Sequence, residues 1–78
     1  MSFVYNENAC TDIRDFFLKR LKVIQHDIAF LQGEVGRAKE LAVQFALQEE
    51  LNRRKFDESV AQIKIEEMEQ ILAFQSKG

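Results

Sequence analysis

The chain has 78 residues, of which 46% are apolar and 31% are charged, and its formal net charge is −2. This composition predicts a folded chain, and the slight acidity argues against a protein that coats nucleic acid, which needs an excess of Lys and Arg. The absence of proline and the presence of only three glycines predict an all-α fold in a single helical domain, residues 1–78.

A domain of this size buries only about 60–65% of its unfolded surface, so its core is marginal unless something supplements it. The single cysteine, Cys10, excludes an internal disulfide, and the single histidine, His26, has no neighbouring thiol with which to bind a metal. We therefore expect no metal and no cofactor. The remaining supplement is a second copy of the chain.

Residues 1–10 are expected to form an N-terminal arm, because Asn6 and Asn8 favour a turn there. Phe3 and Tyr5 in this arm either pack onto the helices of their own chain or cross to a neighbouring chain. Cys10 is expected to be a small, reduced, unreactive apolar residue.

The first helix is expected over about residues 12–32, with Thr11 or Asp12 as its N-cap. One row of apolar residues repeats with spacings of 4, 3, 4 and 3, which is typical of a helix that packs lengthwise on another helix. This row consists of Phe17, Leu21, Ile24, Ile28 and Leu31. A second row, Phe16, Val23 and Phe30, lies about 100° away, so one partner helix does not cover both rows.

Gly33 and Gly36 follow the first helix and predict a helix end and a tight turn, after which the chain reverses. The alternative is a helix that continues through both glycines, because Val35 keeps the apolar phase of both flanking segments. That continuation costs only about 2 kcal/mol relative to alanine at the two positions.

A long helix is expected over about residues 37–75. One line of apolar residues runs along it with spacings that average near 3.6, and we expect this line to be its core face. The line consists of Ala38, Ala42, Phe45, Phe56, Val60, Ile63, Ile71 and Phe74. Polar residues interrupt it at Glu49, Asn52 and Glu67. A helix break between Asn52 and Asp57 is the alternative, and it predicts a three-helix bundle.

The two expected helices differ in length, about 31 Å against about 58 Å at 1.5 Å per residue. The shorter helix then covers only half of the longer one, which leaves apolar residues in need of cover. The sequence therefore predicts a helical hairpin that assembles into a coiled-coil or helical-bundle oligomer, a homodimer or larger.

The compact basic run Arg53, Arg54 and Lys55 is a candidate phosphate-binding site. Glu49 and Glu50 precede the two arginines by four residues, an order that favours neutralisation along the helix instead. The clustered glutamates, such as Glu66 and Glu67, lack the Glu-x-x-His spacing of a di-metal bundle. No catalytic constellation is present, so we expect no enzymatic activity.

The sequence predicts a non-enzymatic interaction module, a homo-oligomeric adaptor or inhibitor that binds and blocks or scaffolds a larger protein. Chaperones, phage-type inhibitors and assembly factors are examples of this class. The predicted partner-binding residues are Ile65, Met68, Leu72, Phe16, Val23 and Phe30. A nucleic-acid or nucleotide binder that uses Arg53, Arg54 and Lys55 is the alternative. With no apolar run of about 18 residues, we expect a cytoplasmic protein without membrane contact.

Overall fold

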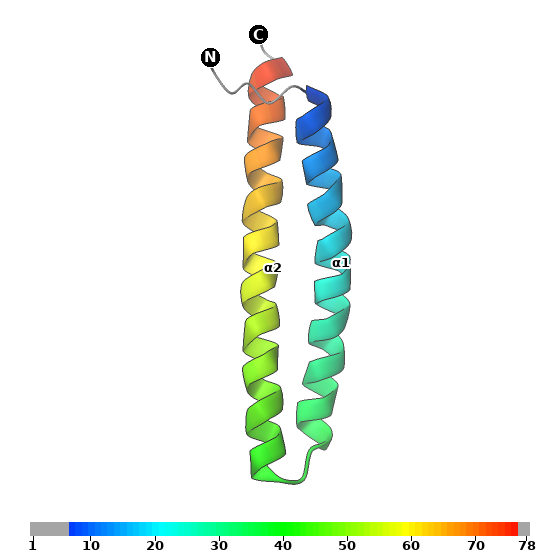
Figure 1. Ribbon diagram of the computed structural model, residues 1–78, viewed down its shortest axis with the longest axis vertical. Helices are drawn as coiled ribbons and strands as arrows, with labels where there is room; N and C mark the ends of the chain where they lie inside the picture. Colours follow the sequence, from blue (N-terminus) through cyan, green and yellow to red (C-terminus); the bar gives the residue numbers. More distant parts are fainter. Residues whose placement is uncertain (1–6, 77–78) are drawn as a thin grey trace.

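The computed structural model describes residues 7–76, which form two long α-helices: α1, Glu7–Arg37, and α2, Leu41–Ser76. The helices lie side by side and run antiparallel, so that α1 begins and α2 ends at the same end of the molecule (Figure 1). The molecule is a rod with extents of 57 × 21 × 15 Å. The predicted all-α helical hairpin is confirmed. The three-helix alternative has no support, because α2 continues through Asn52 and Asp57.

The first helix is longer than predicted at both ends. It begins at Glu7 instead of Thr11 or Asp12, and it ends at Arg37 instead of Gln32. Cys10 lies seven residues before Phe17, in the same apolar row, and it is completely buried. Burial of this side chain favours helix formation ahead of the predicted start. Residues 7–10 of the expected arm are therefore helical, whereas Phe3 and Tyr5 lie outside the described residues.

The predicted turn at Gly33 and Gly36 is wrong, because both glycines are helical residues with negative φ. Val35 and Ala38 are half-buried and continue the core row of α1 past both glycines. Packing of that row offsets the low helix propensity of two glycines, which is about 1 kcal/mol each.

The chain reverses at Ala38, Lys39 and Glu40. The amide of Ala38 still donates to the carbonyl of Glu34 at 3.0 Å, and the amide of Gln44 donates to the carbonyl of Glu40 at 2.9 Å. The side-chain amide of Gln44 also donates to the carbonyl of Ala38 at 2.6 Å. These bonds satisfy backbone groups that helix ends leave unpaired, so no left-handed glycine is needed at this turn.

The core lies between the two helices, and the predicted core row of α1 is confirmed. Ile24 and Ile28 are buried, and Phe17, Leu21 and Leu31 pack against them. The residues of α2 that face α1 repeat with spacings of 4 and 3 in step with this row. They are Leu47, Leu51, Arg54, Glu58, Ala61, Ile65, Met68 and Leu72.

The predicted core face of α2 is wrong. Phe45 and Phe56 are each 69% exposed and Phe74 is 80% exposed, so the line assigned to the core lies mainly on the outside. A row that averages 3.5 residues per turn stays against a partner helix of the same spacing along its whole length, whereas a 3.6-residue line drifts away from it. The row with Leu51 and Ala61 meets that condition, although it contains Arg54 and Glu58.

The expected mismatch in helix length is also wrong. The two helices have 31 and 36 residues, so α1 covers nearly all of α2. The predicted oligomer therefore has to be argued from the side chains that the hairpin leaves exposed.

Candidate interaction surface

Three large apolar side chains of α1 point away from the core. Phe16, Val23 and Phe30 are 58%, 62% and 60% exposed, and we call them the α1 outer row. They follow one another at intervals of seven residues and so lie along one line of the helix. Phe16 packs edge to face on the ring of Phe17, with centroids 5.2 Å apart, which holds it beside the core.

A second exposed set lies on α2. Phe56, Val60 and Ile63 are exposed and follow one another at intervals of four and three residues, and we call them the α2 outer row. Val60 and Phe16 line one surface hollow of about 370 Å³, together with Arg20 and Asp57. The two outer rows therefore approach each other on one side of the hairpin, where Phe16 and Val60 line the same hollow.

The other side of the hairpin is mainly polar. Helical spacing places two groups of polar residues there. The apolar exceptions on this side are Leu18 and, near the turn, Leu41 and Phe45. The group from α1 contains Asp15, Lys22 and Gln25, and the group from α2 contains Gln48, Asn52, Lys55, Ser59 and Gln62. Gln48 donates to Asn52 at 3.1 Å on this side. Apart from Leu18, the large exposed apolar side chains of the central rod thus lie on one side.

Three predicted partner-binding residues are used by the hairpin itself. Ile65 and Met68 are buried against α1, and Leu72 is half-buried. They reach a partner only if the two helices separate. The other three predicted residues, which make up the α1 outer row, are open to a partner. The sequence placed Phe56, Val60 and Ile63 on the apolar line of the long helix, whose far half was expected to need cover from a second copy, and so it did not predict them as a surface for a different protein.

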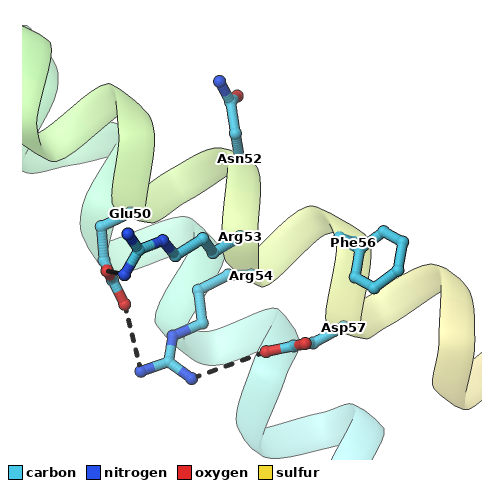
Figure 2. A pocket seen from close by; sticks show the side chains of 6 residues that line it. All are labelled: Glu50, Asn52, Arg53, Arg54, Phe56 and Asp57. Carbon is cyan, nitrogen blue, oxygen red and sulfur yellow. Dashed lines mark ion pairs between the residues drawn. The ribbon is translucent and has the colours of Figure 1, made fainter.

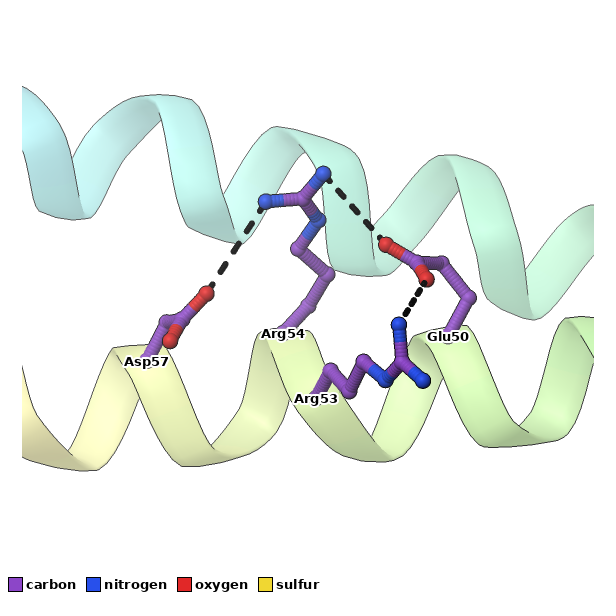
Figure 3. A network of polar contacts seen from close by, with 4 residues as sticks. All are labelled: Glu50, Arg53, Arg54 and Asp57. Atoms are coloured by element: carbon purple, nitrogen blue, oxygen red, sulfur yellow. Dashed lines mark ion pairs between the residues drawn. The ribbon is translucent and has the colours of Figure 1, made fainter.

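The basic run of α2 is neutralised by carboxylates of the same helix. Glu50 forms ion pairs with Arg53 at 3.7 Å and with Arg54 at 3.4 Å, and Asp57 pairs with Arg54 at 3.8 Å (Figure 3). Arg54 extends toward α1, because it belongs to the row that faces the partner helix. Two acidic and two basic groups leave this network without net charge.

The hollow beside this network is open and contains both signs of charge. The hollow has a volume of about 490 Å³. It is lined by Glu50, Asn52, Arg53, Arg54, Phe56 and Asp57 (Figure 2). Lys55 does not line it, because the helical spacing places Lys55 on the polar side of the hairpin. The three basic residues do not converge on one point, and the two carboxylates would repel a phosphate there.

The described residues contain no group of three or more His, Cys, Asp or Glu side chains that could hold a metal ion. His26 is exposed on α1, and Cys10 is buried. Neither described helix contains a segment long and apolar enough to cross a membrane. Comparisons with protein-family models, with curated proteins and with solved structures found no match.

Proposed function

We propose that this protein is a non-enzymatic interaction module of the cytoplasm, a homo-oligomeric helical adaptor or inhibitor that binds a larger protein. The observation that carries the proposal is the one-sided exposure of the α1 and α2 outer rows. Monomeric proteins rarely expose contiguous apolar patches of more than a few hundred Å², and larger patches mark interaction sites.

The two outer rows suit two different partners. The α1 outer row lies beside the groove between the helices, whereas Phe56 and Ile63 lie on the outer face of α2, away from α1. A contact that covers the α1 outer row leaves Phe56 and Ile63 open. We assign the α1 outer row to a second copy of the chain and the α2 outer row to the larger protein.

The energy available to self-association is modest. A two-fold contact buries six side chains, three from each copy, and burial of the area still exposed contributes about 1–2 kcal/mol for each. The loss of translational and rotational freedom costs at least about 4 kcal/mol, which leaves a net gain of several kcal/mol. We therefore expect dissociation constants in the range of about 10–100 μM, which suits a regulated assembly.

The proposal is tested by affinity capture with a tagged chain. Immobilised wild type should retain both an untagged second copy and a larger protein from a lysate of the source cells. The double variant Phe56→Ser/Ile63→Ser should lose the larger protein, because its apolar contact is gone, and should still retain the second copy.

The matched control is Asn52→Ser/Ser59→Ala, on the polar side of the same helix, which should retain both. Retention of neither partner by wild type would refute the module, and equal retention of the larger protein by all three chains would refute the assignment of the α2 outer row. Circular dichroism checks that each variant keeps its helicity.

The nucleic-acid alternative is less well supported by the charges. Arg53 and Arg54 are already paired with Glu50 and Asp57. A phosphate would have to displace those carboxylates or bind beside them, so we do not propose this function.

A further inference from the structure

The α1 outer row is symmetric about Val23, with a phenylalanine at the same distance on either side. Val23 lies seven residues after Phe16 and seven residues before Phe30. When two copies of α1 lie antiparallel with a two-fold axis at Val23, Val23 meets its own copy and Phe16 meets Phe30 of the second copy. Apolar side chains then face apolar side chains along the whole contact.

The charges beside this row are complementary in the same arrangement. Arg20 and Asp27 lie on the flank nearest α2, because Arg20 shares a hollow with Val60 and Asp27 shares one with Glu50 and Arg54. The two residues are placed almost symmetrically about Val23, three residues before it and four after it. The antiparallel contact therefore brings each Arg20 close to Asp27 of the second copy.

These two charges have no ion-pair partner within the hairpin, as far as residues 7–76 are concerned. Arg20 is exposed and Asp27 is half-buried. Each is thus available to a second copy without the loss of an existing pair. Lys19 and His26 on the other flank are both basic and add no attraction.

From this spacing and charge pattern we infer that two copies of the chain pair antiparallel through the α1 outer row, with the axis at Val23 and the two turns at opposite ends. The inference rests on the proposed self-association and specifies its geometry. The pair of Arg20 with Asp27 of the second copy occurs twice, once on each side of the axis, as an isologous contact requires.

Two other arrangements fit less well. In a parallel pair of α1 helices the two-fold axis runs along the helices, so the flank with Arg20 and Asp27 faces the opposite flank of the second copy. Arg20 then lies close to Lys19 of the second copy, which is repulsive, and Arg20 does not meet Asp27. In the other arrangement, α1 of one copy packs on α2 of the second copy, and the two rods lie in register. Phe30 then lies near Glu50 of the second copy, because the two residues line one hollow of the hairpin and so stand at the same height along the rod. The parallel pair thus matches the apolar row but lacks both ion pairs, and the pair of α1 with α2 does not match apolar residues along the full row.

Charge reversal tests the inference. Arg20→Asp places an aspartate against Asp27 of the second copy, and Asp27→Arg places an arginine against Arg20, so each variant alone should dimerise about tenfold more weakly than wild type. An equimolar mixture of the two variants should regain wild-type affinity, because every contact in the mixed dimer is then between opposite charges. Lys22→Asp is the control for Arg20→Asp, because it makes the same change in net charge on the polar side.

Sedimentation equilibrium supplies the dissociation constants, and the outcomes separate two failures. A wild type that stays monomeric refutes the proposed self-association. A wild-type dimer whose affinity is unchanged by Arg20→Asp and Asp27→Arg refutes the antiparallel contact alone. Circular dichroism of each variant excludes loss of fold as the cause of weaker pairing.

A distance measurement tests the orientation without any change in the contact. Lys39→Cys in the turn carries a spin label, and wild type, whose only cysteine is buried, is the labelling control. Val23 and Lys39 are sixteen residues apart, which is about 24 Å along a helix, so antiparallel pairing places the two labels about 50 Å apart. A separation below about 25 Å would show that the turns lie at the same end and would overturn the inference.

Discussion

Burial of single side chains distinguishes the two faces of α2. Leu51 is 4% exposed and belongs to the same buried cluster as Ile24 and Ile28, whereas Phe45 is a larger residue that is 69% exposed. Residue type alone would rank Phe45 as the more important of the two for stability. The structure reverses that order.

We expect Leu51→Ala to lower the free energy of unfolding by about 2–5 kcal/mol, because it leaves a cavity between the helices. Phe45→Ala should lower it by less than about 1 kcal/mol, because the ring is mostly in water. Urea denaturation followed by circular dichroism measures both values. A larger loss for Phe45→Ala would mean that the outer line of α2, and not the row with Leu51, forms the core.

At the scale of a helix, the end of α1 depends on competition between two glycines and the packing of the row that contains them. Gly36 is helical, and a Cβ atom added there meets nothing within 4 Å. The added Cβ of Gly33 would lie 3.3 Å from the flexible guanidinium group of Arg37. Both positions thus tolerate alanine, which a turn with left-handed glycines would not.

Gly36→Ala should raise the free energy of unfolding by about 0.5–1 kcal/mol, because alanine has less backbone entropy to lose and favours the helix. Gly33→Ala is the comparison, with a smaller gain if Arg37 has to move. Thermal unfolding at a fixed protein concentration measures both. A lower midpoint for Gly36→Ala would place the turn at the glycines after all.

The sequence predicted each element to a different degree. Both helices and the core row of α1 followed from periodicity, because Phe17 to Leu31 form one unbroken line. The reversal was expected from the two glycines, and it occurs after them because both lie inside α1. The core face of α2 did not follow, because α2 is apolar on two sides and its true core row contains Arg54 and Glu58. The spacing of four and three that α1 shows was the usable signal, since Ala61, Ile65, Met68 and Leu72 repeat it.

The candidate site was predicted in part for the same reason. Phe16, Val23 and Phe30 are exposed as expected of a second row, whereas Ile65 and Met68 are inside the hairpin. The wrong face of α2 was assigned to the core, so residues expected at the surface are buried and residues expected in the core are exposed. Apolar residues at helical spacing do not by themselves distinguish a buried row from an exposed one, and only the match to the spacing of the α1 row separates the two faces of α2.

At the scale of the whole molecule, a hairpin of two helices has one shared seam and no third layer to cover its sides. The two helices nearly match in length, so each runs beside the other over most of the rod, and the α1 and α2 outer rows lie along its middle. A second copy placed against the α1 outer row adds that layer. The central claim is therefore that the hairpin associates with itself through this row.

Sedimentation equilibrium of wild type beside Val23→Asp, from about 10 to 500 μM, tests this claim most directly. Wild type should move from the monomer mass of 9.1 kDa toward twice that value as concentration rises. Val23→Asp should remain a helical monomer throughout, because two carboxylates meet at the proposed axis. A wild type that stays at 9.1 kDa over the whole range, or a variant that dimerises as wild type does, would contradict the account.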